Sequence, residues 1–114
     1  MQPAAPKYSL ADVKNAARLG NIVIEPRSKA QRDIANLEYS LDDVIACLSS
    51  LQEHEFNDCS TVTLSARQGR LIEVAADSYV TEFTGPTGAI DKLYVKFRVA
   101  ATWLTIHSFH LSTK

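Results

Sequence analysis

The sequence predicts a single α+β domain in which N-terminal helices pack on a C-terminal antiparallel sheet. The chain has 114 residues, of which 46% are hydrophobic, and this is enough for one compact core. Residues 9–51 contain N-cap residues that are followed by apolar residues at helical spacing. Residues 59–112 instead consist of β-branched and aromatic stretches that are separated by turns. We therefore expect one domain over residues 9–114, preceded by a flexible tail at residues 1–8.

Three helices are expected in the N-terminal part. The first begins after Ser9, a favourable N-cap, and ends at Gly20. A short strand, "NIVIEP", follows at residues 21–26 and is ended by its proline. A second helix is expected after Ser28 and a third after Ser40, which precedes two aspartates in the first helical turn. The apolar stripe of the third helix comprises Leu41, Val44, Ile45, Leu48 and Leu51.

The C-terminal part predicts strands at "STVTLS", "RLIEVA", "YVTEF", "KLYVKFRVA" and "WLTIHSFHLS". Turns are expected near "RQG", "GPTG" and "AAT". In "LYVKFRV" apolar and polar residues alternate strictly, so that Tyr94, Lys96 and Arg98 share one face of the strand. This face is either a solvated exterior or an anion-binding surface.

Two histidines, His107 and His110, occur in the last predicted strand, and their placement depends on the preceding turn. A two-residue turn pairs Lys96 with His107 and places that histidine on the cationic face. A three-residue turn pairs Tyr94 with His110 and places His110 there instead. Because their separation is odd, a regular strand puts the two histidines on opposite faces, so a shared metal is not expected.

Composition and motifs exclude several classes of protein. The net charge is −1, so no strong basic field indicates a nucleic-acid partner by itself. No apolar run has the length of a membrane span or of a signal peptide, and we expect a cytoplasmic protein with no membrane partner. Cys47 and Cys59 lack metal-ligand spacing and are interpreted as packing residues. Phosphate loops, zinc-helix motifs and nucleophile elbows are absent from the sequence.

The order and spacing of these segments resemble those of MqsR-type toxins, the messenger RNA interferases of bacterial type II toxin–antitoxin modules. "YSLADVK", the following "RS" and the segment ending in "EHEF" resemble the family's N-terminal half, and "LYVKF" and "SF" resemble its last two strands. The resemblance covers most of residues 8–112. It implies a RelE-like α+β fold, cleavage of messenger RNA that inhibits growth, no metal or small-molecule cofactor, and a cognate antitoxin as partner.

The resemblance also implies a set of catalytic residues. Tyr94 and Lys96 match the tyrosine and lysine of the family's penultimate strand, and His110 stands where the family has the lysine of "S-F-K". The match of His110 requires the longer turn, and with the shorter turn His107 takes its place. Cleavage without a metal needs a base for the ribose 2′-hydroxyl, an acid for the leaving 5′-oxygen and cations for the phosphate charge.

Arg98 is expected to contact RNA from the same face. Asp58 stands where the family has a catalytic lysine, and residues 62–78 look like an insertion whose Arg67 and Arg70 are further candidates for RNA contact. The alternative function is that of a catalytically degenerate MqsR-like protein that binds an antitoxin or RNA.

Overall fold

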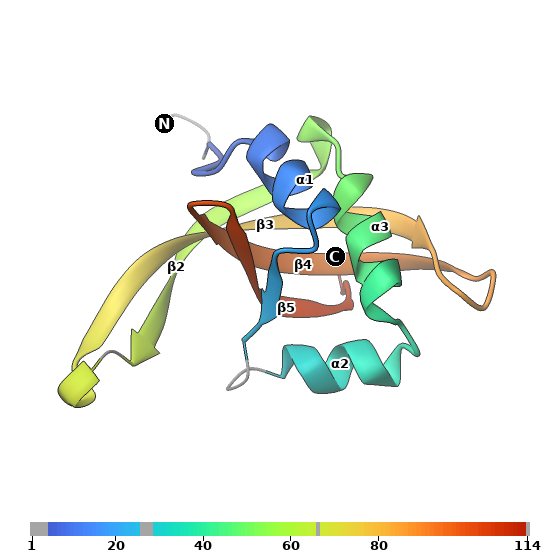
Figure 1. The fold of residues 1–114 in the computed structure, drawn as a ribbon. Coiled ribbons are helices and arrows are strands. Elements are labelled where there is room, and N and C mark those ends of the chain that lie inside the picture. The colour runs from blue at the N-terminus through green and yellow to red at the C-terminus, as the bar shows by residue number, and fades with distance from the viewer. Residues whose placement is uncertain (1–4, 26–28, 66, 114) are drawn as a thin grey trace.

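The computed structural model describes residues 5–25, 29–65 and 67–113 and has the expected α+β architecture (Figure 1). No helix in these ranges is long and apolar enough to cross a membrane. The helices and strands are α1 (Leu10–Arg18), β1 (Ile22–Ile24), α2 (Ala30–Asn36), α3 (Leu41–Ser49), β2 (Phe56–Ser65), β3 (Leu71–Thr84), β4 (Ile90–Ala100) and β5 (Trp103–Leu111), with single 3₁₀ turns at Glu53–Glu55 and Arg67–Gly69.

The strands form one sheet in the order β1-β5-β4-β3-β2. β2 to β5 pair antiparallel, as predicted, but β1 joins the edge of β5 in parallel, which makes the sheet mixed. Ile22 and Ile24 of β1 pair with Leu104 and Ile106. The parallel pairing is possible because α2, α3 and three strands intervene between β1 and β5 along the chain.

Two segments that were predicted as separate strands, "RLIEVA" and "YVTEF", belong to the single strand β3. The residues between them keep their pairing with β2, from Ala76 with Ser60 to Ser78 with Asp58. Asp77 is fully buried in this stretch. Its carboxylate accepts hydrogen bonds of 2.9 Å from the backbone N–H groups of Lys7 and Tyr8, so a residue typical of turns is satisfied inside a strand.

Local signals set the helix starts. The Ser9 hydroxyl accepts a bond from the first turn of α1, and Ser40 forms a capping box with Asp43 at the start of α3. At α2 the N-cap is Lys29, which makes no side-chain capping bond, and the predicted cap Ser28 lies outside the described residues. Lys7 and Tyr8, at the end of the segment predicted as a flexible tail, are held by Asp77, so the anchored chain begins before Ser9.

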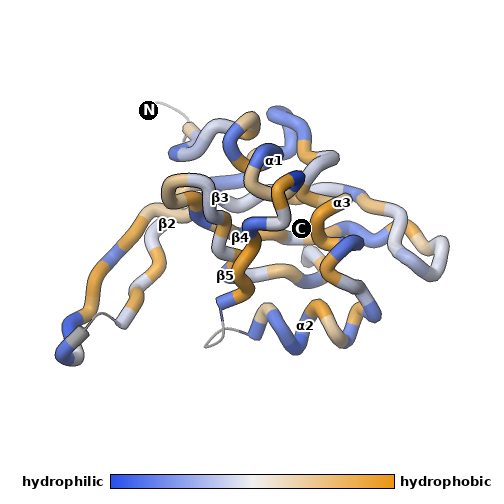
Figure 2. Tube along the Cα trace, in the orientation of Figure 1, coloured by the Kyte–Doolittle hydropathy of each residue, from blue (hydrophilic) through white to orange (hydrophobic). Residues whose placement is uncertain are grey.

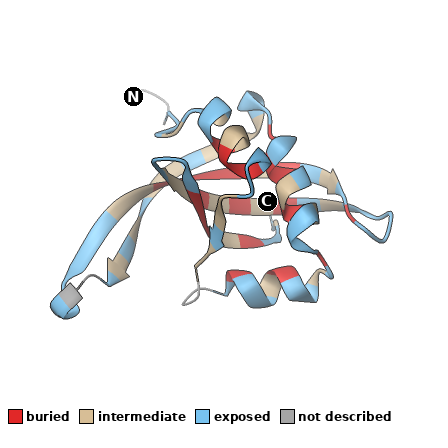
Figure 3. Cartoon of the chain, in the orientation of Figure 1, coloured by how far each residue is buried: buried red, intermediate tan, exposed pale blue. Residues whose placement is uncertain are grey.

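The hydrophobic core lies between the three helices and one face of the sheet. Figure 3 shows buried segments where the helices meet the central strands, and Figure 2 shows hydrophobic stretches along α3. The opposite face, which carries Tyr94, Lys96 and Arg98, has none of these helices packed on it, and we call it the open face. The largest buried side chains are Tyr79, Phe97, Phe109, Leu48, Leu51, Leu93, Leu104 and Ile106.

The β2–β3 hairpin extends beyond the rest of the sheet. β4 pairs with β3 only from Asp77 onward, and so residues 60–65 and 71–76 form a two-stranded ribbon that we call the arm (Figure 1, yellow-green). At its tip Gln68 and Gly69 adopt positive φ angles of 64° and 73°, which close the turn. Most of the segment predicted as an insertion, residues 62–78, therefore lies in the arm.

Candidate functional site

The β4–β5 hairpin contains both of the predicted registers, because a β-bulge separates them. Near the turn Phe97 pairs with Ile106, as a two-residue turn requires. Further along, Lys96 pairs with Ser108 and Tyr94 pairs with His110, as the longer turn would have required. His107 is the additional residue between these two stretches.

The bulge places both histidines on the open face, and the expectation that they lie on opposite faces is wrong. His107 Nε2 accepts a hydrogen bond of 3.2 Å from Arg98 Nε. The His110 ring stacks on Tyr94, with ring centroids 5.2 Å apart and an interplanar angle of 19°. The odd separation of the histidines would divide them only in a regular strand, and the extra residue restores a common side.

Three cross-strand pairs therefore follow one another along the open face, and we call them the polar row. Consecutive members on β4 are two residues apart, so the pairs repeat about every 7 Å and the row extends about 13 Å. It joins two cations, a phenol and two imidazoles on one surface. Lys96 with Ser108 and Tyr94 with His110 are register partners, whereas Arg98 and His107 are joined by their hydrogen bond, because the register partner of Arg98 is Thr105.

His107 is a neutral residue that orients Arg98. Its side chain is only 9% exposed. Burial lowers its pKa from the usual 6.5, the charges of Arg98 and Lys96 lower it further, and only Glu25 opposes them. Because Nε2 accepts the bond from Arg98, the ring proton of the neutral form lies on Nδ1. This lone pair is already engaged, and His107 is a poor candidate for the catalytic base that the shorter turn assigned to it.

His110, unlike His107, is exposed and keeps a ring nitrogen that can accept a proton. It is exposed, and its Nδ1 lies 2.8 Å from the backbone carbonyl of Leu111. A carbonyl oxygen only accepts, so Nδ1 carries the proton and Nε2 of the neutral ring is left as an acceptor. The stacked Tyr94 ring limits how the imidazole can turn. The pair is thus arranged for proton transfer at Nε2.

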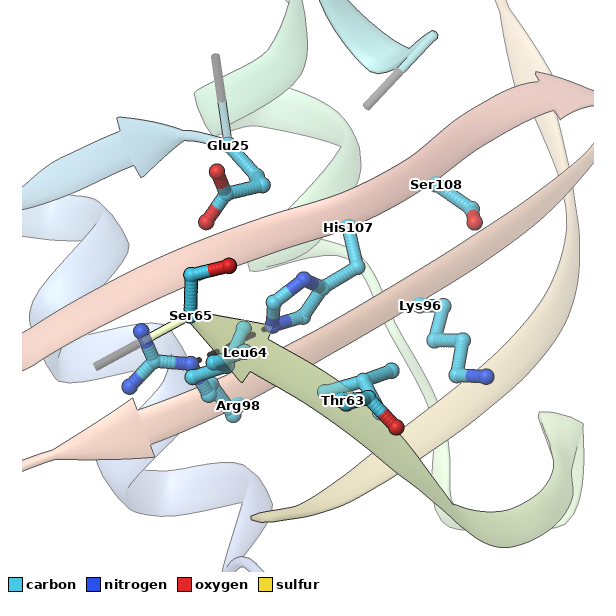
Figure 4. A pocket seen from close by; sticks show the side chains of 9 residues that line it. Glu25, Thr63, Leu64, Ser65, Lys96, Arg98, His107 and Ser108 are labelled. Carbon is cyan, nitrogen blue, oxygen red and sulfur yellow. Dashed lines mark hydrogen bonds between the residues drawn. The ribbon is translucent and has the colours of Figure 1, made fainter. Parts of the chain in front are cut away.

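A groove of about 430 Å³ lies beside the polar row (Figure 4). One wall is the open face of β4 and β5, and the other is the arm, which curls toward it. Figure 4 shows the side chains of Thr63 and Ser65 on the arm side, and Glu25 at the end of β1. The described residues that line it are Glu25, Val62, Thr63, Leu64, Ser65, Lys96, Arg98, His107 and Ser108.

The groove can hold an anion, because two cations and several hydroxyl groups line its concave surface. Glu25 adds one carboxylate that can accept a bond from an N–H group of a ligand. The contributions of Thr63, Ser65 and Glu25 were not foreseen from the sequence. Alternating hydroxyl and apolar residues in "STVTLS" were the only available sign, and they do not indicate that the arm bends over the open face.

Arg70 and Asp58 do not line the groove. Arg70 is exposed near the tip of the arm, and the side chain of Arg67 lies outside the described part of the structure. Asp58 is exposed on β2, where it pairs with Ser78, which in turn pairs with Lys96. The Asp58 carboxylate therefore lies in the same row across the strands, the transverse row, as the candidate catalytic cation Lys96.

Other chemistries find little support in the described residues. None of their His, Cys, Asp and Glu side chains form a group of three or more that could hold a metal ion. Burial, followed by the charge of Glu55, raises the pKa of the Cys47 thiol to about 12. Burial, followed by Asp77, raises the pKa of Cys59 as well, so neither thiol is an activated nucleophile.

Comparison with known proteins does not assign the chain to a family. No protein-family model matches it, and no curated protein is significantly similar to it. The functional assignment therefore depends on the chemistry of the polar row and the groove.

Proposed function

We propose that the protein is a metal-independent endoribonuclease that cleaves messenger RNA, as the toxin of a type II toxin–antitoxin module. The observation that carries the proposal is the polar row, which brings Tyr94, Lys96, Arg98 and His110 to one open face beside a groove. The resemblance of the sequence to MqsR-type, RelE-like toxins supports the same activity, a cytoplasmic location and a cognate antitoxin as partner.

In the proposed reaction the 2′-hydroxyl of one nucleotide attacks the adjacent phosphorus. His110 Nε2 takes the proton of this hydroxyl, and the bond from phosphorus to the 5′-oxygen of the next nucleotide breaks. The Tyr94 hydroxyl, beside His110, gives its proton to the leaving 5′-oxygen. Afterwards His110 releases the proton that it took to solvent, and Tyr94 recovers one from solvent. The products are a 2′,3′-cyclic phosphate and a 5′-hydroxyl, and no metal or redox partner is required.

The two cations of the row stabilise the charge on the phosphate. Lys96 lies one pair along from Tyr94 and His110, about 7 Å away by strand geometry, within reach of a long side chain. Arg98 lies one pair further, held by His107, and suits the neighbouring phosphate of the strand. Fixed donors of this kind favour the transition state because they need no reorganisation during the reaction.

A second function, binding without cleavage, is favoured by Asp58. Its carboxylate lies in the transverse row that contains Lys96, where it opposes the approach of a phosphate. A protein that retains the fold but binds only an antitoxin or RNA would tolerate such an anion. The two functions predict different behaviour of the same variants.

Expression of the chain alone in bacteria, with growth and transcript integrity followed together, tests the proposal. We expect growth arrest with transcript cleavage, and loss of both in His110→Ala and in Tyr94→Phe. General acid and base groups contribute rate factors of about 10²–10⁴, so each variant should fall below the level needed for arrest. His110 is exposed, and His110→Ala should keep the melting temperature of the wild type.

Arrest that persists in both variants would remove the site assignment. Normal growth with intact transcripts from the folded wild-type protein would instead favour the binding function. Arg32→Ala serves as the matched control, because Arg32 is an exposed cation of α2, in the helix layer, and its loss should leave arrest unchanged.

A further inference from the structure

Trp103 is the only tryptophan of the chain, and half of its surface is exposed to solvent. It is the first residue of β5 and pairs with Ala100. It does not belong to the hydrophobic core formed by the described residues. Half of this large aromatic surface is available to a ligand, and this makes Trp103 a candidate for ligand contact.

Trp103 lies on the open face, in line with the polar row. Leu104 and Ile106 are buried in the core, so the alternating residues Trp103 and Thr105 belong to the other side of β5. Thr105 pairs with Arg98, which makes Trp103 the diagonal neighbour of Arg98 across the strands. Diagonal neighbours lie about 7–8 Å apart, near enough for their long side chains to meet one ligand.

We propose that Trp103 is a base-stacking site for an unpaired nucleotide next to the one that is cleaved. This inference depends on the proposed function and names its substrate as single-stranded RNA. Arg98 would hold the phosphate of that nucleotide while the indole ring covers its base. Every base has a flat π-face, and so the site accepts a nucleotide without requiring one sequence.

The position of the charges favours a nucleotide over an apolar protein segment. Arg98 is the diagonal neighbour of Trp103 in the register, and Lys96 follows two residues along β4, so the indole ring shares its face with both cations of the row. At the other end of the row Tyr94 and His110 form a second aromatic pair. The two aromatic ends are about 20 Å apart by the rise per residue, with cations between them, which is an arrangement typical of single-strand tracks.

The emission of the single tryptophan gives a direct test. The probe is a mixed-sequence single-stranded RNA of about 12 nucleotides with 2′-O-methyl groups, which removes the attacking hydroxyl and prevents cleavage. We expect this RNA to quench the emission of the full-length protein at the same concentrations that raise the fluorescence anisotropy of a labelled copy. The corresponding duplex should leave the emission unchanged, because its bases stay stacked.

Variants then separate stacking from general binding. Trp103→Ala should weaken binding of the labelled single strand about tenfold, since stacking on an aromatic side chain contributes about 1–3 kcal/mol per base. Trp103→Phe retains a ring and should lose much less affinity. Leu19→Ala is the control, because Leu19 is an exposed apolar residue at the end of α1, in the helix layer. All variants should melt like the wild type.

Two different failures are distinguishable. If anisotropy reports binding while the indole emission does not change and Trp103→Ala binds as well as the wild type, the stacking site is refuted and the proposed function stands. If neither signal responds to single-stranded RNA, the proposed ribonuclease and the stacking site are both overturned.

Discussion

Replacement of Asp58 by Asn and then by Lys is expected to strengthen RNA binding in two equal steps. Asp58 is separated from Lys96 by one strand, through Ser78, and two strand spacings place it about 10 Å from a phosphate at Lys96. At this distance in water one unit charge contributes about 0.4 kcal/mol. Each step changes the charge at this position by one, and so each should lower the Kd about twofold at low ionic strength.

The fold should tolerate these changes. Asp58 is exposed, and among the side-chain hydrogen bonds of the described residues its carboxylate accepts only the 2.9 Å bond from the backbone N–H of Cys59, which Asn can also accept. The control series is Glu38→Gln and Glu38→Lys, because Glu38 is an exposed residue beside the helices and its variants change the net charge equally. This series should have little effect on the Kd.

The assay is the fluorescence anisotropy of a labelled single-stranded RNA at low salt and near 1 M salt, where the Debye length of about 3 Å screens the interaction. The twofold steps should be present at low salt and vanish at high salt. Equal affinities of the wild type, Asp58→Asn and Asp58→Lys at low salt would refute the placement of the bound phosphate at Lys96. Equal gains in the Glu38 series would show that only net charge matters.

Three other changes test separate parts of the structure. The pKa of His107 in the folded protein lies below its unfolded value of 6.5. As the pH falls, the unfolded state therefore takes up the proton at a higher pH than the folded state does. The stability that His107 confers above pH 6.5 is lost in this range. The melting temperature of the wild type should therefore fall more than that of His107→Gln between about pH 7 and pH 5, and parallel curves would contradict this. Arg98→Ala should reduce the slope of log Kd against log salt by about 0.7, the value for one phosphate contact to a single strand, whereas an unchanged slope would exclude that contact. Asp77→Ala should lower the free energy of unfolding in urea by roughly 3 kcal/mol, because two hydrogen bonds from the N-terminal segment to a buried carboxylate are lost. A matched Glu82→Ala change on the same strand is exposed and should cost little; equal losses would contradict the anchoring role.

Local chemistry was enough to predict the starts of α1 and α3 and the alternation of β4. Ser9 and Ser40 act on their own first turns, and the pattern of Tyr94, Lys96 and Arg98 depends only on strand geometry. The continuity of β3 was not predicted, because Asp77 is satisfied by a segment about seventy residues earlier in the chain. Such long-range partners leave no trace in the local sequence.

The bulge at His107 did leave a trace in the sequence. Leu104 and Ile106 point to the core at even positions, whereas Phe109 points there at an odd one, so the alternation must change between them. The register of a two-residue turn explains the inward positions of Leu104 and Ile106, and the register of a three-residue turn explains only that of Phe109. The curl of the arm over the open face depends on tertiary structure, and the groove could not have been found from strand assignments alone.

The chemical identity of the RNA ends produced by the purified protein tests the central claim most directly. The wild type and His110→Ala would be incubated with single-stranded RNA in excess EDTA, and the new ends would be analysed by mass spectrometry. The account predicts that the wild type leaves 2′,3′-cyclic phosphate and 5′-hydroxyl ends without a divalent metal, and that His110→Ala leaves the RNA intact. RNA that stays intact with the wild type, or ends that carry a 5′-phosphate, would contradict it.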